Sequence, residues 1–196
     1  MGLLIFKIAI ILIWLMKWRW KSLILQKTRS VRWQMPILKK AGLLVNRFPQ
    51  LMEWGLAVII LASFFNIGTI SIKTQWSIGI RIIGMLLFLI GIGLQLYSIN
   101  CLGSNYASGI LIRKGQTLVY HGPYRFIRHP EYAGNILAFT GLAVALFSYP
   151  ALGLALLIYA PFLSYRARVE EKMLTAYFGQ QYRQYRQQVG RFFPTD

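Results

Sequence analysis

Ionisable side chains gather at two places that flank one long uncharged stretch, residues 132–165, of this 196-residue chain. Three of its five acidic residues lie there, and carboxylates can bind a cation or accept a proton. Arginines, which bind anionic groups, accompany them. The members of the two clusters are Arg125, Arg128, His129 and Glu131 before the stretch, and Arg166, Arg168, Glu170 and Glu171 after it.

The first cluster marks the start of a helix. Pro130 suits the first helical position and disfavours helical geometry at His129 before it. Glu131 then falls in the first turn, where the helix dipole favours an anion. A helix cap with arginines reaching to the membrane surface explains these residues as well as a functional site does.

The second cluster is predicted to lie on one helix face, because Arg166 and Glu170 are four residues apart. A solvated helix with one internal ion pair is the simpler interpretation. Gly179 is expected to end this helix. The spacing of Tyr182, Tyr185 and Val189 then predicts a second amphipathic helix on the surface that runs to Pro194.

The composition argues against a soluble domain. Hydrophobic residues make up 56% of the chain and charged residues only 14%, against roughly 25% charged residues in soluble domains. The net charge of +17 requires an anionic partner, and a chain this hydrophobic favours phospholipid over nucleic acid. With Cys101 as the single cysteine and only two histidines, neither an internal disulfide nor a metal cluster is expected.

Uncharged windows predict five membrane spans in an all-α fold. The expected spans are 1–16, 54–72, one within 82–112 that breaks at 103–105, and two arms of a hairpin over 132–165 that turns at 148–150. Pro161 is expected to kink the second arm. Small residues on the first arm predict a close helix contact; they are Gly134, Ala138, Gly141 and Ala145.

Charge sets the expected topology. Residues 17–49 hold nine basic residues and no acidic one, which predicts a cytoplasmic loop. The N-terminus is then outside, and residues 102–131 and 166–196 are cytoplasmic. Tryptophans between the basic residues could also stack on nucleic acid, but this pattern is more typical of a membrane interface. The run Gly91-Ile-Gly93 lacks the third glycine of a dinucleotide fingerprint and is interpreted as helix packing.

Both clusters carry the motifs of a known family. The first reads Gly-Pro-Tyr-x-x-x-Arg-His-Pro-x-Tyr-x-Gly over 122–134, and the second reads Glu-Glu-x-x-Leu-x-x-x-Phe-Gly-x-x-Tyr-x-x-Tyr over 170–185. A final Arg-Phe-Phe-Pro follows at 191–194. With the hairpin between them, these motifs resemble the isoprenylcysteine carboxyl methyltransferase family of integral membrane enzymes, over residues 101–194. We therefore expect a methyltransferase core over 101–196 and N-terminal transmembrane helices over 1–100.

The resemblance implies S-adenosylmethionine as the methyl donor, in a cytoplasmic pocket closed by the C-terminal helices. It implies that Glu170 receives the ammonium of the donor and that Arg166 faces the acceptor, with Arg128 as a further catalytic side chain. Glu131 departs from the small or apolar residue that the family has after the proline. The expected donor-binding residues are Gln116, Thr117, Leu118, Val119, Tyr124, His129, Pro130, Glu131, Tyr132 and Glu170.

The chemistry favours an acidic acceptor on a lipophilic molecule. A carboxylate such as that of a prenylated cysteine is already ionised and needs no general base, and a guanidinium is its natural clamp. A phospholipid amine has to lose a proton, so phospholipid N-methylation is a rival function that requires a base. Two more functions fit the same residues, an NADPH-dependent reductase of the sterol type and a non-catalytic membrane scaffold.

Overall fold

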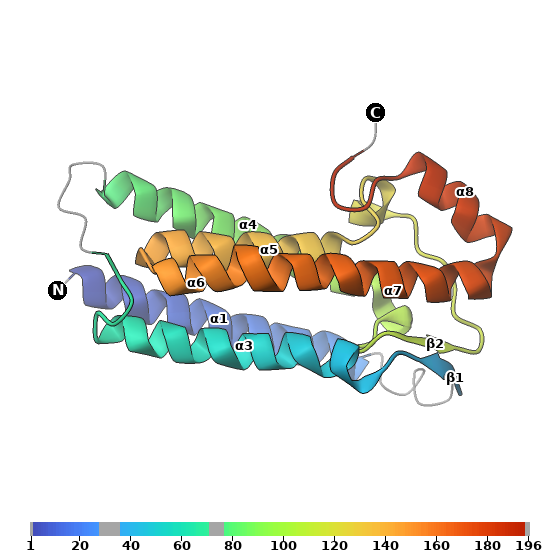
Figure 1. Cartoon of the computed structure of the whole chain (residues 1–196), viewed down its shortest axis with the longest axis horizontal. Helices are drawn as coiled ribbons and strands as arrows, with labels where there is room; N and C mark the ends of the chain where they lie inside the picture. The colour runs from blue at the N-terminus through green and yellow to red at the C-terminus, as the bar shows by residue number, and fades with distance from the viewer. Residues whose placement is uncertain (1, 28–35, 71–76, 195–196) are drawn as a thin grey trace.

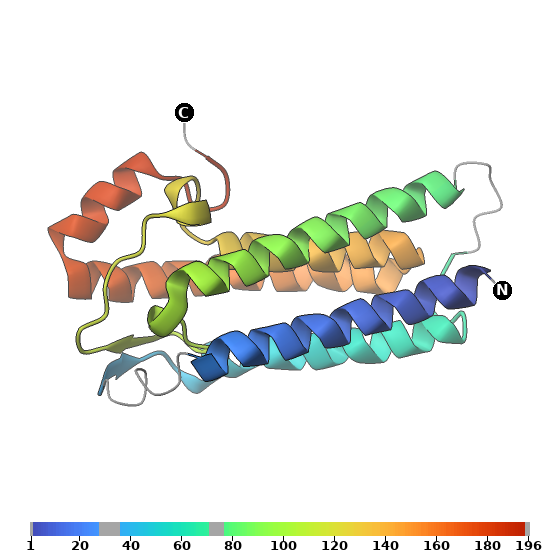
Figure 2. The same cartoon turned by 180° about the vertical axis from the view of Figure 1, so that it is seen from behind.

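The computed structural model describes residues 2–27, 36–70 and 77–194. Long helices lie alongside one another, with a two-stranded ribbon and a short helix at the end away from the N-terminus (Figures 1 and 2). The elements are α1 (Gly2–Lys27), β1 (Ile37–Lys40), α3 (Leu43–Phe64), α4 (Ser77–Leu102), a 3-10 turn (Gly103–Asn105), β2 (Leu111–Arg113), a second 3-10 turn (Gly122–Arg125), α5 (Pro130–Leu146), α6 (Tyr149–Gly153), a π-helical stretch (Leu154–Tyr159), α7 (Ala160–Phe178) and α8 (Gln180–Gln188).

Two helical stretches within the described residues are long and apolar enough to cross a membrane, Ser77–Asn105 and Tyr149–Phe178. Large apolar side chains on the outside of the bundle are exposed, among them Val58, Ile90 and Leu157. A soluble protein rarely exposes so many large apolar side chains, so this outer face suits lipid. The expected number of five spans is a prediction that the helix lengths alone do not establish.

The hairpin forms where the sequence predicts it. The chain leaves α5 through Phe147 in a left-handed conformation, and the Ser148 hydroxyl caps α6 by accepting a hydrogen bond from the Ala151 amide. Pro161 is the second residue of α7, directly after the π-helical stretch. The helix therefore accommodates the missing N–H of the proline by a widened turn next to it.

Glycines allow α4 and α5 to pack backbone against backbone. A methyl group placed on Gly91 would lie 2.4 Å from the Ala138 nitrogen, and one on Gly141 would lie 2.5 Å from the Phe88 nitrogen. The predicted contact of the small residues of α5 is therefore confirmed, and Gly91 serves helix packing as interpreted. This close contact fixes the first turn of α5, which carries Glu131 and directly follows His129.

The N-terminal half differs from the sequence prediction in its boundaries. α1 continues through the basic residues to Lys27, where a loop was expected from residue 17 onward. Lysine and arginine are good helix formers, so charge marks the membrane surface and not the end of the helix. α3 begins at Leu43 and ends at Phe64, before the expected end at residue 72, because the chain turns at Asn66 with a positive φ of 59°. Residues 71 and 72 themselves lie outside the described residues.

Two further features were not predicted. β1 and β2 form an antiparallel ribbon with Lys39 opposite Ile112, although the sequence prediction contained no strands. β1 has four exposed residues and β2 only three residues, which is too short a stretch for hydrophobic alternation to be detected. α8 ends at Gln188 and not near Pro194, because Val189 is extended and Gly190 pairs with Ile127.

Candidate functional site

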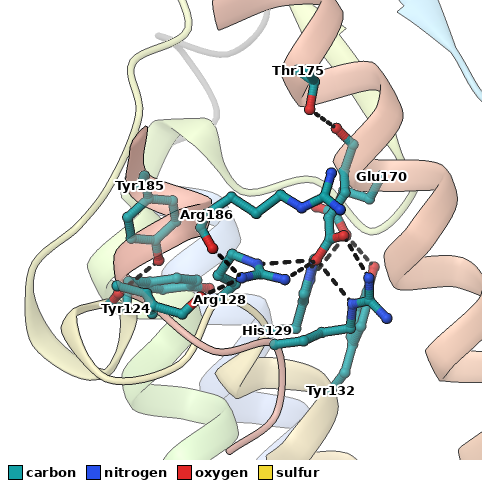
Figure 3. A network of polar contacts seen from close by, with 11 residues as sticks. Tyr124, Arg128, His129, Tyr132, Glu170, Thr175, Tyr185 and Arg186 are labelled. Atoms are coloured by element: carbon teal, nitrogen blue, oxygen red, sulfur yellow. Dashed lines mark hydrogen bonds and ion pairs between the residues drawn. The ribbon is translucent and has the colours of Figure 1, made fainter. Parts of the chain in front are cut away.

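The hairpin brings its two polar ends together, as the sequence predicts. His129 precedes α5 and Glu170 lies in α7, yet the His129 Nδ1 is 3.6 Å from the Glu170 Oε2. The His129 ring also stacks on Tyr132, with the ring centroids 5.3 Å apart. Figure 3 shows the three side chains converging from the two arms. Arg125 and Arg168 are exposed and take no part in this convergence.

Glu171 is the buried centre of the ion pairs. Its side chain is only 4% exposed and lies 3.0 Å from the Arg128 Nη2, 2.8 Å from the Arg191 Nη2 and 3.3 Å from the His129 Nε2. The hydrogen bond to Glu171 raises the pKa of Arg191, so this pair stays ionised at physiological pH. A carboxylate surrounded in this way is not available to a ligand.

Arg128 fastens the C-terminal segment to the start of α5. Its Nη1 donates hydrogen bonds to the Arg186 and Val189 carbonyls, beside the pair with Glu171 (Figure 3). The backbone adds two bonds, from the Arg128 amide to the Gly190 carbonyl and from the His129 amide to the Arg191 carbonyl. The guanidinium expected to act in catalysis is thus bound to protein groups, and we interpret Arg128 as a positioning residue.

Glu170 is held by a relay of hydrogen bonds. The Tyr132 hydroxyl donates to the Glu170 Oε2 at 2.7 Å and accepts from the Arg166 Nε at 2.9 Å. Glu170 and Arg166 share a helix face, as predicted, but Tyr132 bridges them in place of a direct ion pair. With 31% of its side chain exposed, Glu170 is the carboxylate of the pair that can meet a ligand.

A first cavity, the loop-side cavity, lies between the segment after α4, the start of α5, and helices α7 and α8. The space between its walls is about 870 Å³, open solvent at its mouth included. Nine of the ten expected donor-binding residues line it; only Pro130 does not. Its lining includes Asn105, Tyr106, Ile110, Ile112, Gln116, Thr117, Leu118, Val119, Tyr124, His129, Glu131, Tyr132, Arg166, Glu170, Leu174, Phe178, Tyr182 and Tyr185.

A second cavity, the helix-side cavity, lies between α1, α3, α5 and α7 and has about 1110 Å³ of space, again with open solvent. Tryptophans from α1 and α3 and ionisable residues from all four helices line it. The lining of this cavity includes Trp18, Lys21, Glu53, Trp54, Ser108, Asn135, Tyr159 and Leu163.

The two cavities share one wall, made of Tyr106, Glu131, Tyr132 and Arg166. Arg166 is fixed there, because its Nη1 and Nη2 donate to the Val45 and Ser108 carbonyls. Each of these nitrogens carries a second N–H, so the guanidinium can still bind an anion. Molecules bound in the two cavities would therefore meet at a preorganised polar wall.

The tyrosines of the site are hydrogen-bond donors at physiological pH. Burial raises the pKa of Tyr106 and of Tyr124 well above its usual range, and nearby Glu131 adds to this effect. Burial also raises the pKa of Tyr185 to about 12, and its hydroxyl donates to the Tyr124 carbonyl at 2.6 Å. This bond holds α8 over the loop-side cavity.

The sequence did not predict the roles of three residues, two that belong to no motif and one that does. Tyr106 follows the break after α4 without a motif, and Lys21 lies in a part of the chain that resembled no family. Arg191 belonged to a quoted motif, but only the fold reveals its contact with Glu171.

The structure is that of a helical protein with two cavities that share a polar wall. Its similarity to known proteins shows the family. The profile of the phospholipid methyltransferase family matches residues 80–181, just over half of the chain. The chain therefore belongs to this family.

Relatives with assigned names agree with the expected resemblance. The chain is 34% identical over 114 residues to a protein-S-isoprenylcysteine O-methyltransferase of Tribolium castaneum, covering 57% of this chain and 41% of the relative. It is 31% identical over 108 residues to the enzyme of that name from Schizosaccharomyces pombe, covering 48% of this chain and 46% of the relative. The chain thus spans less than half the length of these two relatives.

A solved structure is also similar. The eukaryotic intramembrane Ras methyltransferase ICMT, an isoprenylcysteine carboxyl methyltransferase, superposes with a TM-score of 0.59 at 27% identity. The match covers 74% of this chain and 51% of that structure. The resemblance expected from the two motifs is confirmed.

Proposed function

We propose that this protein transfers a methyl group from S-adenosylmethionine to a carboxylate on a lipid-associated acceptor, such as a prenylated cysteine. One observation carries the proposal: a cavity that holds Glu170 meets a second, tryptophan-lined cavity at a wall that holds Arg166. The similarity to isoprenylcysteine methyltransferases supports the same reaction.

The loop-side cavity has the groups that the donor requires. Glu170 offers a partly exposed carboxylate for the ammonium of the methionine part. Tyr124, Phe178 and Tyr182 offer aromatic surface for the adenosine part, beside the segment 116–119. When bound there, S-adenosylmethionine supplies an electrophilic methyl group on a sulfonium. The protein then has to hold the two reactants in line and exclude water.

Arg166 is proposed to clamp the acceptor carboxylate. Its guanidinium is fixed by three bonds to protein groups before any ligand arrives, so little ordering remains to be done. Trp18 and Trp54 of the helix-side cavity suit the neighbouring lipophilic part at the level of the membrane interface. We place this end of the bundle on the cytoplasmic side of a multi-pass protein, because the described basic residues of 17–27 and 39–47 lie there.

Replacing Arg166 by alanine is expected to raise the KM of the acceptor at least about tenfold, because a charge-assisted hydrogen bond is lost. The Kd of the donor should change less than about threefold. Methyl transfer to N-acetyl-S-farnesylcysteine measures the first quantity and calorimetry the second. Arg166→Lys keeps the charge but loses the hydrogen bonds that the planar guanidinium makes, so it should give an intermediate KM for the acceptor. An unchanged acceptor KM in Arg166→Ala would remove Arg166 from the acceptor site.

Phospholipid N-methylation is the second candidate. The matched family profile is named for phospholipid methyltransferases, and Glu131 in the shared wall could accept the proton of an amine.

Ligand-induced stabilisation tests the proposal against a reductase and a scaffold. At a concentration of about 100 times its Kd, a ligand stabilises a protein by ~2.7 kcal/mol, which raises the Tm by about 5 to 10 °C at this chain length. S-adenosylmethionine should produce such a shift and NADPH should not. A shift with NADPH alone would indicate a reductase, and no shift with either would indicate a scaffold.

A further inference from the structure

Glu131 lies in the wall between the two cavities, where the acceptor group has to meet the donor. Resting on the proposed function, we propose that Glu131 is a specificity-determining residue. In this role Glu131 is a neutral carboxylic acid, and its O–H donates a hydrogen bond to the carboxylate of the acceptor. This role follows from its position, its partners, its surroundings and the chemistry of a carboxylate acceptor.

The position of Glu131 is fixed by the fold. It is the second residue of α5, ahead of the uncharged stretch of the hairpin, and the helix is anchored by the contact of α5 with α4. Of the four residues in the shared wall, Tyr106 and Tyr132 are neutral and Arg166 is a cation. Glu131 is the wall residue whose charge can change.

The partners of Glu131 differ from those of the other site carboxylates. Glu170 and Glu171 have ion-pair partners within 4 Å, whereas Glu131 has none within the described part of the chain. Its Oε1 accepts a hydrogen bond from the Tyr106 hydroxyl at 3.3 Å. The structure gives its Oε2 no hydrogen bond among the described residues, so this oxygen can face a ligand.

The surroundings favour the neutral acid. Burial is the largest effect and raises the pKa of the Glu131 carboxyl, and Glu170 raises it further, while Lys21, Arg166 and the bond from Tyr106 lower it. Ionisable groups face Glu131 from every element packed around it. They are Lys17 and Lys21 from α1, Glu53 from α3, Tyr106 from the segment after α4, Tyr124 from the second 3-10 turn, Tyr132 from α5, Tyr159 from the π-helical stretch, and Arg166 and Glu170 from α7.

An acceptor that is itself a carboxylate further favours the neutral form of Glu131. Two carboxylates in contact cannot both remain ionised in a water-poor site, so they share one proton. Arg166 binds the acceptor from one side, and Glu131 donates a hydrogen bond to it from the other. During transfer an acceptor oxygen forms the bond to the methyl carbon and the bond from this carbon to sulfur breaks. The proton stays on Glu131, and no general base is needed.

The matched pair Glu131→Gln and Glu131→Ala tests the role, because a glutamine N–H can replace the carboxylic O–H. The probe is N-acetyl-S-farnesylcysteine, and its Kd without donor is measured by tryptophan fluorescence, since Trp18 and Trp54 line the acceptor cavity. Glu131→Ala should raise this Kd by about tenfold, the loss of one hydrogen bond to a charged group. Glu131→Gln should stay within about threefold of the unmodified protein.

The pH dependence of acceptor affinity is a second test. If Glu131 only packed against its neighbours, this dependence would be the same in Glu131→Gln as in the unmodified protein. The neutral form of Glu131 binds the acceptor, so affinity is complete below its pKa and falls as the pH rises through it. As the pH rises, the unmodified protein should lose affinity for the acceptor, and Glu131→Gln should not.

Two results would overturn the inference. Glu131→Gln could lose as much methyl transfer as Glu131→Ala, which would make the ionised carboxylate a general base for a protic acceptor. The affinity of the unmodified protein could also be independent of pH. Failure of the proposed function is distinct, because the unmodified protein would then not methylate the probe at all.

Discussion

Replacing Glu170 by alanine is expected to weaken the binding of S-adenosylmethionine by about 10- to 100-fold, the value of a hydrogen bond to a charged group. Glu170 is a partly exposed carboxylate in the loop-side cavity, and Tyr132 and His129 hold it in place from two sides. Removing it leaves the ammonium of the donor without a counter-charge. Calorimetry on the purified protein in detergent measures the change.

The control is Glu170→Gln. The amide can still accept the hydrogen bond from Tyr132 but carries no charge, so most of the loss should persist. Equal donor affinity in the unmodified protein and in Glu170→Ala would contradict the placement of the ammonium.

Glu171→Ala is expected to have the largest effect on stability. It leaves Arg128 and Arg191 without their shared counter-ion, and breaking a buried ion pair from one side costs ~3 to 5 kcal/mol. Because these arginines attach the segment 180–193 to the start of α5, we expect this segment to detach while the hairpin stays folded. Limited proteolysis should then cut within residues 180–193, and donor affinity should fall with the loss of Tyr182 and Tyr185 from the cavity.

The neighbouring carboxylate provides the comparison. Glu170→Ala should leave resistance to the protease unchanged, since Glu170 does not hold the C-terminal segment. If Glu171→Ala were as resistant to cleavage as the unmodified protein, the assignment of Glu171 as the centre of this attachment would be wrong.

The C-terminal half of the fold could be predicted because local signals and helix contacts agree there. Pro130 starts α5, Ser148 caps the turn of the hairpin, and Gly179 ends α7. In the N-terminal half the windows of uncharged residues located apolar segments but not helix ends. Lys7 illustrates the difference: it lies within α1, where its ammonium is buried and donates to the Ser63 carbonyl.

The site could be predicted as a set of residues but not as an arrangement. Sequence spacing placed His129 beside Glu170, and nine of the ten expected donor residues line one cavity. Glu171 pairs with Arg128 and Arg191, and Glu170 stays available to a ligand. Which of the two carboxylates the arginines contact depends on the fold and could not be read from the sequence. The helix-side cavity was not predicted, because α1 and α3 supply half of its wall and carry no motif.

Transfer of a labelled methyl group tests the central claim most directly. Purified protein is incubated with methyl-labelled S-adenosylmethionine, N-acetyl-S-farnesylcysteine and phosphatidylethanolamine in mixed micelles. We predict label in a base-labile ester of the farnesylcysteine, and at least about tenfold less of this label in Arg166→Ala when the acceptor concentration is below its KM. Label in the phospholipid amine alone, or in neither acceptor, would contradict the account.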